Sequence, residues 1–349
     1  KDLGSACYWR KPQMGKYIIK RLLLGLIVLM GVIIITFFLT RVLPTDPALK
    51  WAGMKATPEQ VQAARIELGL DKPIYTQFIT YFSDLLHGDL GTSYVTRKPV
   101  LTELKEAIPA TLELVFYSSV LATILGTFLG IHAARKKNKL TDHHVRIFSI
   151  GSVSIPTFVL ALVLQLVFFS WLHILPLGGR VSTDISILYQ LPDITGWLTI
   201  DSLITGNWAI FKDALLHLIL PAIPIAVYPM GTVARMTRSS LLEVLGEDYL
   251  TAARSYGIKE SFILWVYALK NTIGTTATVI ALTIGYTLVN TFLIESIFSW
   301  PGIGKYVAES VLAMNYPAIM GVTLFSTVAY LLLNLLADLV IAVDPRVRV

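Results

Sequence analysis

The segment Glu247–Asn271 is the longest charge-bearing amphipathic stretch between two apolar runs of this sequence. Its opening carboxylates, Glu247 and Asp248, suit a helix N-terminus, where unsatisfied N–H groups leave partial positive charge. Gly257 is typical of a helix end, because only glycine takes the left-handed conformation there without steric cost. The spacing predicts a short helix over 247–256, a sharp turn at Gly257 and a second helix beyond it. Such an element either docks into a cleft of a partner protein or lies at the lipid interface.

A second group of polar side chains lies on or beside the apolar run 273–294. Its members are Thr283, Thr287, Asn290 and Glu295. Residues of this kind either line a water-filled path for a polar solute or pack neighbouring helices together, and both readings stay open. A carboxylate at the membrane centre costs roughly 2.5–3.5 kcal/mol on insertion scales, but far less at the outer mouth. The position of Glu295 alone therefore does not establish a functional role.

Catalytic and metal-binding spacings are absent from the sequence. It contains no phosphate-binding G-x-x-x-x-G-K-[ST] loop, no H-E-x-x-H motif and no nucleophile elbow. The pair His143-His144 is typical of a solvated loop, and the single cysteine, Cys7, excludes an internal disulfide and a cysteine metal site. We therefore predict a non-enzymatic chain with no catalytic residue, no metal site and no cofactor of its own. Any nucleotide-driven work must come from another subunit.

The composition indicates an integral membrane protein. Of the 349 residues, 54% are hydrophobic and 15% are charged, against about 25% charged residues in a typical soluble domain. The formal net charge is +6, which in a membrane protein first concerns topology. A nucleic-acid partner is not expected, because no basic face with interleaved aromatic residues is found.

Six apolar runs are long enough to cross a bilayer. They cover residues 22–40, 108–134, 147–175, 214–234, 273–294 and 319–343. Basic clusters follow the second and fourth runs, at 135–139 and 235–238, so the positive-inside rule predicts that both termini are cytoplasmic. The predicted fold is an all-α integral membrane protein with six transmembrane helices. It forms one transmembrane domain over residues 14–349, preceded by an upstream or expression-derived segment at residues 1–13.

Residues 44–106 interrupt this pattern as a small polar insert. Thr57-Pro58-Glu59-Gln60 matches a capping box with proline at the first helical position, and Pro73 opens a second helix. Acids and bases nearly balance, which fits the outside of the membrane. We predict a helical extracytoplasmic insert that is too small for its own core and packs on the membrane domain.

The segment over 247–271 resembles the cytoplasmic signature loop of binding-protein-dependent ABC importer permeases, in their dipeptide/oligopeptide/nickel branch. The resemblance rests on Glu247-Asp248-Tyr249, Ala252-Ala253 and Gly257, although Thr251 replaces the usual glutamate and Lys270 the usual proline. Further matching stretches are Pro44-Thr45-Asp46-Pro47, His87-Gly88-Asp89-Leu90-Gly91, Ile108-Pro109-Ala110-Thr111, Ser154-Ile155-Pro156, Phe298-Ser299-Trp300-Pro301-Gly302 and Asp344-Pro345-Arg346. Together they cover essentially all of Met14–Val349.

The resemblance implies a multi-pass permease of the bacterial or archaeal cell (inner) membrane. It would form half of a translocation channel for peptides or similar small solutes, beside a second homologous permease subunit. Two cytoplasmic ATPase subunits, which bind ATP and Mg, would grip the coupling loop 247–271, and an extracytoplasmic binding protein would deliver the substrate. The implied coupling residues are Glu247, Asp248, Tyr249, Ala252, Ala253, Arg254 and Gly257, with Ala253 on the docking face.

Two alternatives stay open at this point. Within the same family, the permease could serve nickel or short oligosaccharides. From another class, the chain could be a secondary transporter or channel that needs no ATPase, which predicts paired intramembrane charges and broken helices. The apolar runs carry almost no charges, and this counts against ion coupling.

Overall fold

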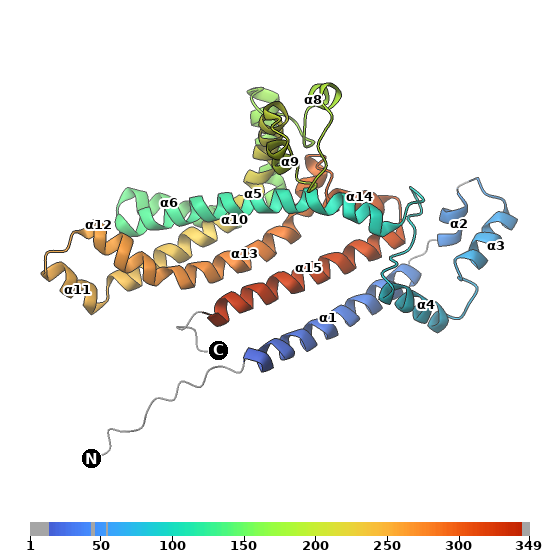
Figure 1. The fold of residues 1–349 in the computed structure, drawn as a ribbon, viewed down its shortest axis with the longest axis horizontal. Coiled ribbons are helices and arrows are strands. Elements are labelled where there is room, and N and C mark those ends of the chain that lie inside the picture. The colour runs from blue at the N-terminus through green and yellow to red at the C-terminus, as the bar shows by residue number, and fades with distance from the viewer. Residues whose placement is uncertain (1–13, 43–45, 54, 344–349) are drawn as a thin grey trace, which may run out of the picture.

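The computed structural model describes residues 14–42, 46–53 and 55–343. The predictions that fall on residues 1–13, on Pro44 and Thr45 and on the stretch 344–346 lie outside these ranges. Long helices run side by side along the molecule (Figure 1), and the described elements are all helical apart from one isolated bridge between Thr92 and Pro99. This confirms the predicted all-α class.

The helices follow one another in a simple order. They are α1 (Met14–Val42), α2 (Pro47–Ala52), α3 (Pro58–Glu67), α4 (Ile74–Leu86), α5 (Val100–Arg135), α6 (Leu140–Ser154), α7 (Thr157–Leu164), η1 (Gln165–Trp171), α8 (Thr183–Leu188), α9 (Leu198–Ile204), α10 (Trp208–Leu245), α11 (Asp248–Ser255), α12 (Glu260–Phe262), η2 (Ile263–Ala268), α13 (Leu269–Ile297), α14 (Ile303–Leu312) and α15 (Tyr316–Val343). Within the described residues, five helices are long and apolar enough to cross a membrane, or six if one bent pair counts as a single span.

The third predicted span is bent. Residues 147–175 were expected to form one membrane span, and the structure divides them between α6 and the α7–η1 segment, which meet at an angle of 105°. Pro156 has no N–H to continue the helix and disfavours helical backbone at the residue before it. Ile155 is accordingly extended, with φ −89° and ψ 121°. The third apolar run therefore forms two helical pieces.

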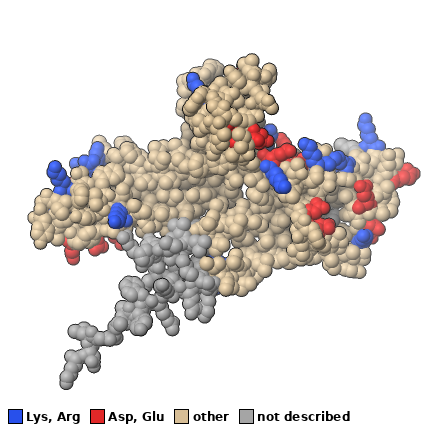
Figure 2. Space-filling view, in the orientation of Figure 1, with Lys and Arg blue, Asp and Glu red and all other residues tan. Residues whose placement is uncertain are grey.

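Several helices also extend beyond their apolar runs. The helix of the second apolar run is α5, which begins at Val100, so residues 100–106 of the predicted insert belong to α5. The fourth apolar run lies inside α10, which spans 38 residues and contains Pro221, Pro224 and Pro229. Prolines are tolerated within membrane helices where neighbouring groups satisfy the freed carbonyls. Figure 2 shows a broad uncharged belt between charged side chains at the α11 end and those toward the insert.

The seam between α5 and α10 is closely packed. A Cβ placed on Gly126 would lie 2.8 Å from the carbonyl oxygen of Met230, and one on Gly130 would lie 2.7 Å from that of Ala234. Only glycine fits at such distances, and a Gly-x-x-x-Gly spacing brings helix backbones together in membrane proteins. The α5–α10 pair is the centre of the bundle.

The insert folds as its capping signals predicted. In α3, Gln60 N donates to Thr57 Oγ1 and Thr57 N donates to Gln60 Oε1 at 2.9 Å, which completes the capping box. The next helix, α4, packs against the end of α1, where the ring of Phe37 lies 5.2 Å from that of Phe78 and 5.6 Å from that of Tyr81. Burial in this contact raises the pKa of Tyr81 to about 12. These aromatic contacts connect the insert to the membrane helices.

Candidate functional site

The short helix α11 is fixed to the bundle by its inward face. Leu250 is fully buried, and Ala253 is only 9% exposed. Both side chains belong to one apolar cluster with Ile131 of α5, Leu241 of α10 and Ile263 of η2. The cluster positions α11 at the end of the bundle, next to the last turn of α10 (Figure 1). The helix is therefore part of the packed structure rather than a loose loop.

The predicted glycine turn is present at the end of α11. Gly257 has φ +76°, the left-handed region in which glycine carries no steric cost. Gly257 N donates to Arg254 O at 2.9 Å, and Ile258 N donates to Ala253 O at 3.2 Å. These bonds satisfy carbonyls that a helix end otherwise leaves open. The turn therefore aims α11 and starts the next helical segment.

Two side-chain contacts hold α11 against its flanking segments. The Arg254 guanidinium pairs with Glu260 at 2.6 Å and donates to Leu245 O at 3.3 Å. Asn271, on α13, donates from its Nδ2 to the hydroxyl of Tyr249 on α11 at 2.7 Å. Exposed ion pairs contribute little to stability. The contacts instead define the orientation of α11 relative to α10 and α13.

The outward face of α11 and the residue that follows the helix carry exposed aromatic groups. Tyr249, on α11, is 47% exposed, and Tyr256, directly after its last residue, is 87% exposed. Glu247, Asp248 and Ala252 lie on the surface as well. A rigid, exposed helix with tyrosines and acids is suited to contact a protein partner, because aromatic anchors carry much of the energy of protein interfaces.

One residue of the predicted docking face points the other way. Ala253 is turned into the bundle, next to Leu250, so its placement on the docking face is wrong. Helical spacing groups Ala253 with Tyr249 and Tyr256, but it groups Ala253 equally well with Leu250. The apolar partners on η2 decide between these two faces. The roles in coupling of Glu247, Asp248, Tyr249, Ala252, Ala253, Arg254 and Gly257 stay predictions.

The predicted pathway residues on α13 do not share one open face. Thr283 and Thr287 are buried, and their hydroxyls donate to Ile280 O at 2.8 Å and Thr283 O at 2.7 Å. Asn290 is partly exposed and donates to Tyr286 O at 2.9 Å. Within the predicted set, Asn290 is the residue best placed to contact a solute, while the two threonines pack within the bundle.

Glu295, the fourth residue of that set, has a structural use. It is fully buried, and its Oε2 accepts a hydrogen bond of 2.6 Å from Gly304 N, in the first turn of α14. A carboxylate at this place satisfies an open N–H group and complements the positive end of the helix. A Cβ on Gly302 would lie 2.4 Å from the same oxygen, so the close approach requires glycine there. A pathway role for Glu295 remains a prediction.

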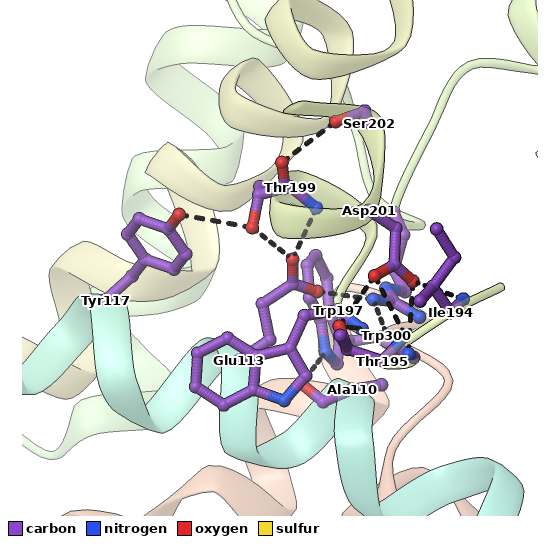
Figure 3. Close-up of polar contacts among 12 residues, drawn as sticks. Ala110, Glu113, Tyr117, Ile194, Thr195, Trp197, Thr199, Asp201, Ser202 and Trp300 are labelled. Carbon is purple, nitrogen blue, oxygen red and sulfur yellow. Dashed lines mark hydrogen bonds and ion pairs between the residues drawn. The ribbon is translucent and has the colours of Figure 1, made fainter. Parts of the chain in front are cut away.

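A polar cluster that the sequence did not reveal joins α5 to the segment 176–207, which we call the cap (Figure 3). Glu113 of α5 is buried, and Arg180 Nη2 donates to its Oε2 at 2.5 Å. Its Oε1 accepts from the backbone N and the hydroxyl of Thr199, at 2.9 and 2.6 Å. Tyr117 completes the cluster by donating to the Thr199 hydroxyl at 3.1 Å. The one signal in the sequence that could have indicated this cluster is Glu113, a carboxylate inside the apolar run 108–134.

Asp201 organises the backbone of the cap. Its carboxylate accepts from Ile194 N, Thr195 N and Gly196 N at 2.9–3.1 Å and from the Thr195 hydroxyl at 2.6 Å. Burial acts to raise the pKa of Asp201, but these hydrogen bonds outweigh it and hold the pKa below its ordinary value. The loop is thus fixed around an ionised carboxylate.

Another buried carboxylate lies toward the opposite end of the bundle. Asp142, at the start of α6, accepts from Arg238 of α10 through Nε at 2.5 Å and Nη2 at 2.9 Å. Asn138 N donates to the same carboxylate at 2.9 Å. A bidentate pair of this kind fixes both distance and orientation. It joins the loop after α5 to the half of α10 that leads into α11.

Each of these polar groups has a structural use. Each carboxylate described above accepts hydrogen bonds from its own chain. Among the described residues, no group of three or more His, Cys, Asp and Glu side chains could hold a metal ion. What the arrangement offers is a short helix fixed at one end of a bundle whose long helices are apolar enough to cross a membrane.

Comparison with known proteins assigns this architecture. Residues 126–349 match the family described as "Binding-protein-dependent transport system inner membrane component", and residues 14–115 match the N-terminal family of the same membrane components. The two matches together span nearly the whole chain. They confirm the resemblance carried by the segment 247–271.

Curated relatives agree over almost their full length. A probable D,D-dipeptide transport system permease protein of Escherichia coli K12 is 44% identical over 322 residues, which cover 92% of this chain and 94% of the relative. A dipeptide transport system permease protein of the same strain is 38% identical over 96% of this chain and 99% of the relative. A di/tripeptide transport system permease protein of Pseudomonas aeruginosa is 37% identical over the same shares. The chain therefore belongs to the binding-protein-dependent transport system inner membrane components, the membrane permease subunits of ABC importers.

Proposed function

We propose that this permease imports dipeptides or similarly short peptides. The observation that carries the proposal is the match to relatives named for dipeptide and di/tripeptide transport, over more than nine tenths of both chains. The polar and aromatic groups of the bundle suit such a cargo, because a peptide presents amide groups that asparagine and tyrosine can bind. Tyr286 is 40% exposed, and its ring lies 4.4 Å from that of Tyr228. Together with Asn290, this pair marks the proposed path.

The coupling part of the proposal concerns α11. Two cytoplasmic ATPase subunits, which hold ATP and Mg, each contact one permease, and α11 is the contact on this chain. The support is its rigid mounting on the bundle together with the exposed tyrosines at positions 249 and 256. Closure of the ATPase pair then moves α11, and α10 carries the movement into the membrane. A second, homologous permease forms the other half of the channel.

The proposed topology places the α11 end and both termini in the cytoplasm and the insert outside. Basic residues 135–139 lie at the α11 end, as the positive-inside rule requires. The charged helices α2 and α3 then face the extracytoplasmic binding protein. Labelling of single cysteines in intact cells with an impermeant reagent tests this arrangement. Position 55 should react and position 137 should not, and the reverse pattern would overturn the topology.

The experiment for the function is uptake of labelled peptides into vesicles that contain the whole importer and internal ATP. We expect uptake of dipeptides that requires both ATP and the binding protein, with no comparable uptake of nickel or of short oligosaccharides. In parallel, Tyr256→Ala should lower uptake and the amount of ATPase that copurifies. Tyr189→Ala, at a tyrosine of the cap that is 40% exposed, is the matched control and should leave both unchanged. Uptake that persists without the ATPase subunits would refute the proposal.

A further inference from the structure

The helix α4 carries more apolar surface than its contact with the bundle uses. Its side chains form two apolar stripes at helical spacing. The inner stripe of α4 consists of Phe78, Tyr81 and Leu85, and the outer stripe consists of Tyr75, Ile79 and Leu86. Together the two stripes span nearly half of the helix surface. Thr80, Ser83 and Asp84 lie opposite them and are exposed, and we call these three residues the polar arc of α4.

The inner stripe accounts for the contact with α1. Phe78 and Tyr81 meet the ring of Phe37, which is itself buried. Leu85 is partly buried on the same side of the helix. Figure 1 shows α4 beside the end of α1 and outside the bundle of long helices. One side of α4 is therefore packed, and its orientation against α1 is set.

The outer stripe has no such partner among the described residues. Tyr75 is 67% exposed, Ile79 is 63% exposed and Leu86 is 73% exposed. A soluble protein rarely leaves three large apolar side chains in line on one helix face. The stripe needs an apolar environment that lies beside α1 and not inside the bundle.

The surface of α1 identifies this environment. Near its contact with α4, α1 exposes Ile35, Phe38 and Leu39, and only 11% of its apolar window is buried within the chain. On a membrane-spanning helix such a surface is suited to face lipid. Phe38 packs edge-on against Phe37, which holds α4, so the outer stripe continues this apolar surface of α1.

We propose that α4 is an interfacial helix that lies on the bilayer surface at the end of α1, with its outer stripe in the lipid. The polar arc fixes the orientation, because the opposite one would bury Thr80, Ser83 and Asp84 in hydrocarbon and leave the apolar stripes in water. Tyr75 takes the place usual for aromatic side chains, at the boundary between lipid and water. The insert is then anchored to the membrane by α4, and α2 and α3 stay in water.

Site-directed spin labelling of the complete importer in lipid nanodiscs tests this placement. The chain has a single cysteine, Cys7, so Cys7→Ser gives a cysteine-free background. Ile79→Cys and Leu86→Cys place the label on the outer stripe. Thr80→Cys and Ser83→Cys are the matched controls on the polar arc of the same helix. The readout is the collision rate of each label with oxygen, which concentrates in lipid, and with a water-soluble nickel chelate.

We expect the ratio of oxygen to nickel-chelate collisions to be higher at positions 79 and 86 than at positions 80 and 83. Equal ratios at all four positions would place α4 in water and overturn the proposal. Low collision rates with both reagents at 79 and 86 would instead show a protein contact, with the second permease. A drop in both collision rates at positions 79 and 86 that occurs only after the binding protein is added would assign the outer stripe to a contact with that protein. Either result would also overturn the lipid assignment.

Discussion

Gly257 offers the sharpest test of the coupling segment, because a substitution there introduces backbone strain without a side-chain clash. The residue has φ +76°, and a Cβ added there would meet no heavy atom within 4 Å. Gly257→Ala therefore introduces backbone strain alone, about 1–2 kcal/mol, and Gly257→Val adds the further cost of β-branching. A cost of this size shifts the population of the docked α11 conformation by a factor of about 5–30. The bundle itself is packed elsewhere and should stay folded.

The matched control is Gly151→Ala in α6. A Cβ at Gly151 also meets no heavy atom within 4 Å, but the residue lies inside a helix with ordinary backbone. Alanine is more stable than glycine there by about 0.5–1 kcal/mol. We expect ATP-driven peptide uptake to fall in Gly257→Ala, to fall further in Gly257→Val and to be preserved in Gly151→Ala. Uptake at the wild-type level in Gly257→Val, measured beside the amount of bound ATPase, would refute the assigned coupling role of the turn.

Two further predictions follow from buried groups. Ala253→Asp places an unpaired carboxylate in the cluster around Leu250, at a cost above the roughly 2–7 kcal/mol of an unpaired neutral polar group. Thermal unfolding of the purified variant should therefore occur at a lower temperature than in the wild type. Ala252→Asp, on the exposed face, should weaken ATPase binding without this loss of stability, and equal stability of the two variants would contradict the inward orientation of Ala253. Asp201 has a pKa below its ordinary value when folded, so its contribution to stability is fully present above its unfolded pKa of about 3.9 and is lost as the pH falls through the folded pKa. Melting curves between pH 6 and 3 should therefore show a smaller acid-induced loss in Asp201→Asn than in the wild type, and parallel curves would contradict the role of the cap hydrogen bonds.

Local signals in the sequence predicted much of the fold. The capping box at Thr57 and the turn at Gly257 are formed as expected, because each depends on one or two residues and their own backbone. The apolar runs likewise located the membrane helices, since their length and composition are local properties. Pro156 was visible in the sequence, but the 105° bend was not, because proline can also sit in a continuous membrane helix.

The missing parts of the site depend on contacts between distant segments. Glu113 and Arg180 are 67 residues apart in the sequence, and nothing local indicates that the cap folds back onto α5. Ala253 fits either face of α11 by spacing, and only the apolar residues of η2 select the inward one. The contact between Glu295 and the N-terminus of α14 was not predictable either, because the two come close only in the folded chain.

The glycine contacts between α5 and α10 determine how the bundle can deform. With Gly126 and Gly130 against backbone carbonyls, the two helices have no slack to slide past one another. The two helices therefore form one closely packed unit, and α11 follows α10 just beyond Leu245. If α11 couples to an ATPase subunit, as proposed, its movement reaches α5 and α10 together. Relative movement between helices is easier at the margin of the bundle, where α1 touches the rest of the described residues mainly through α15.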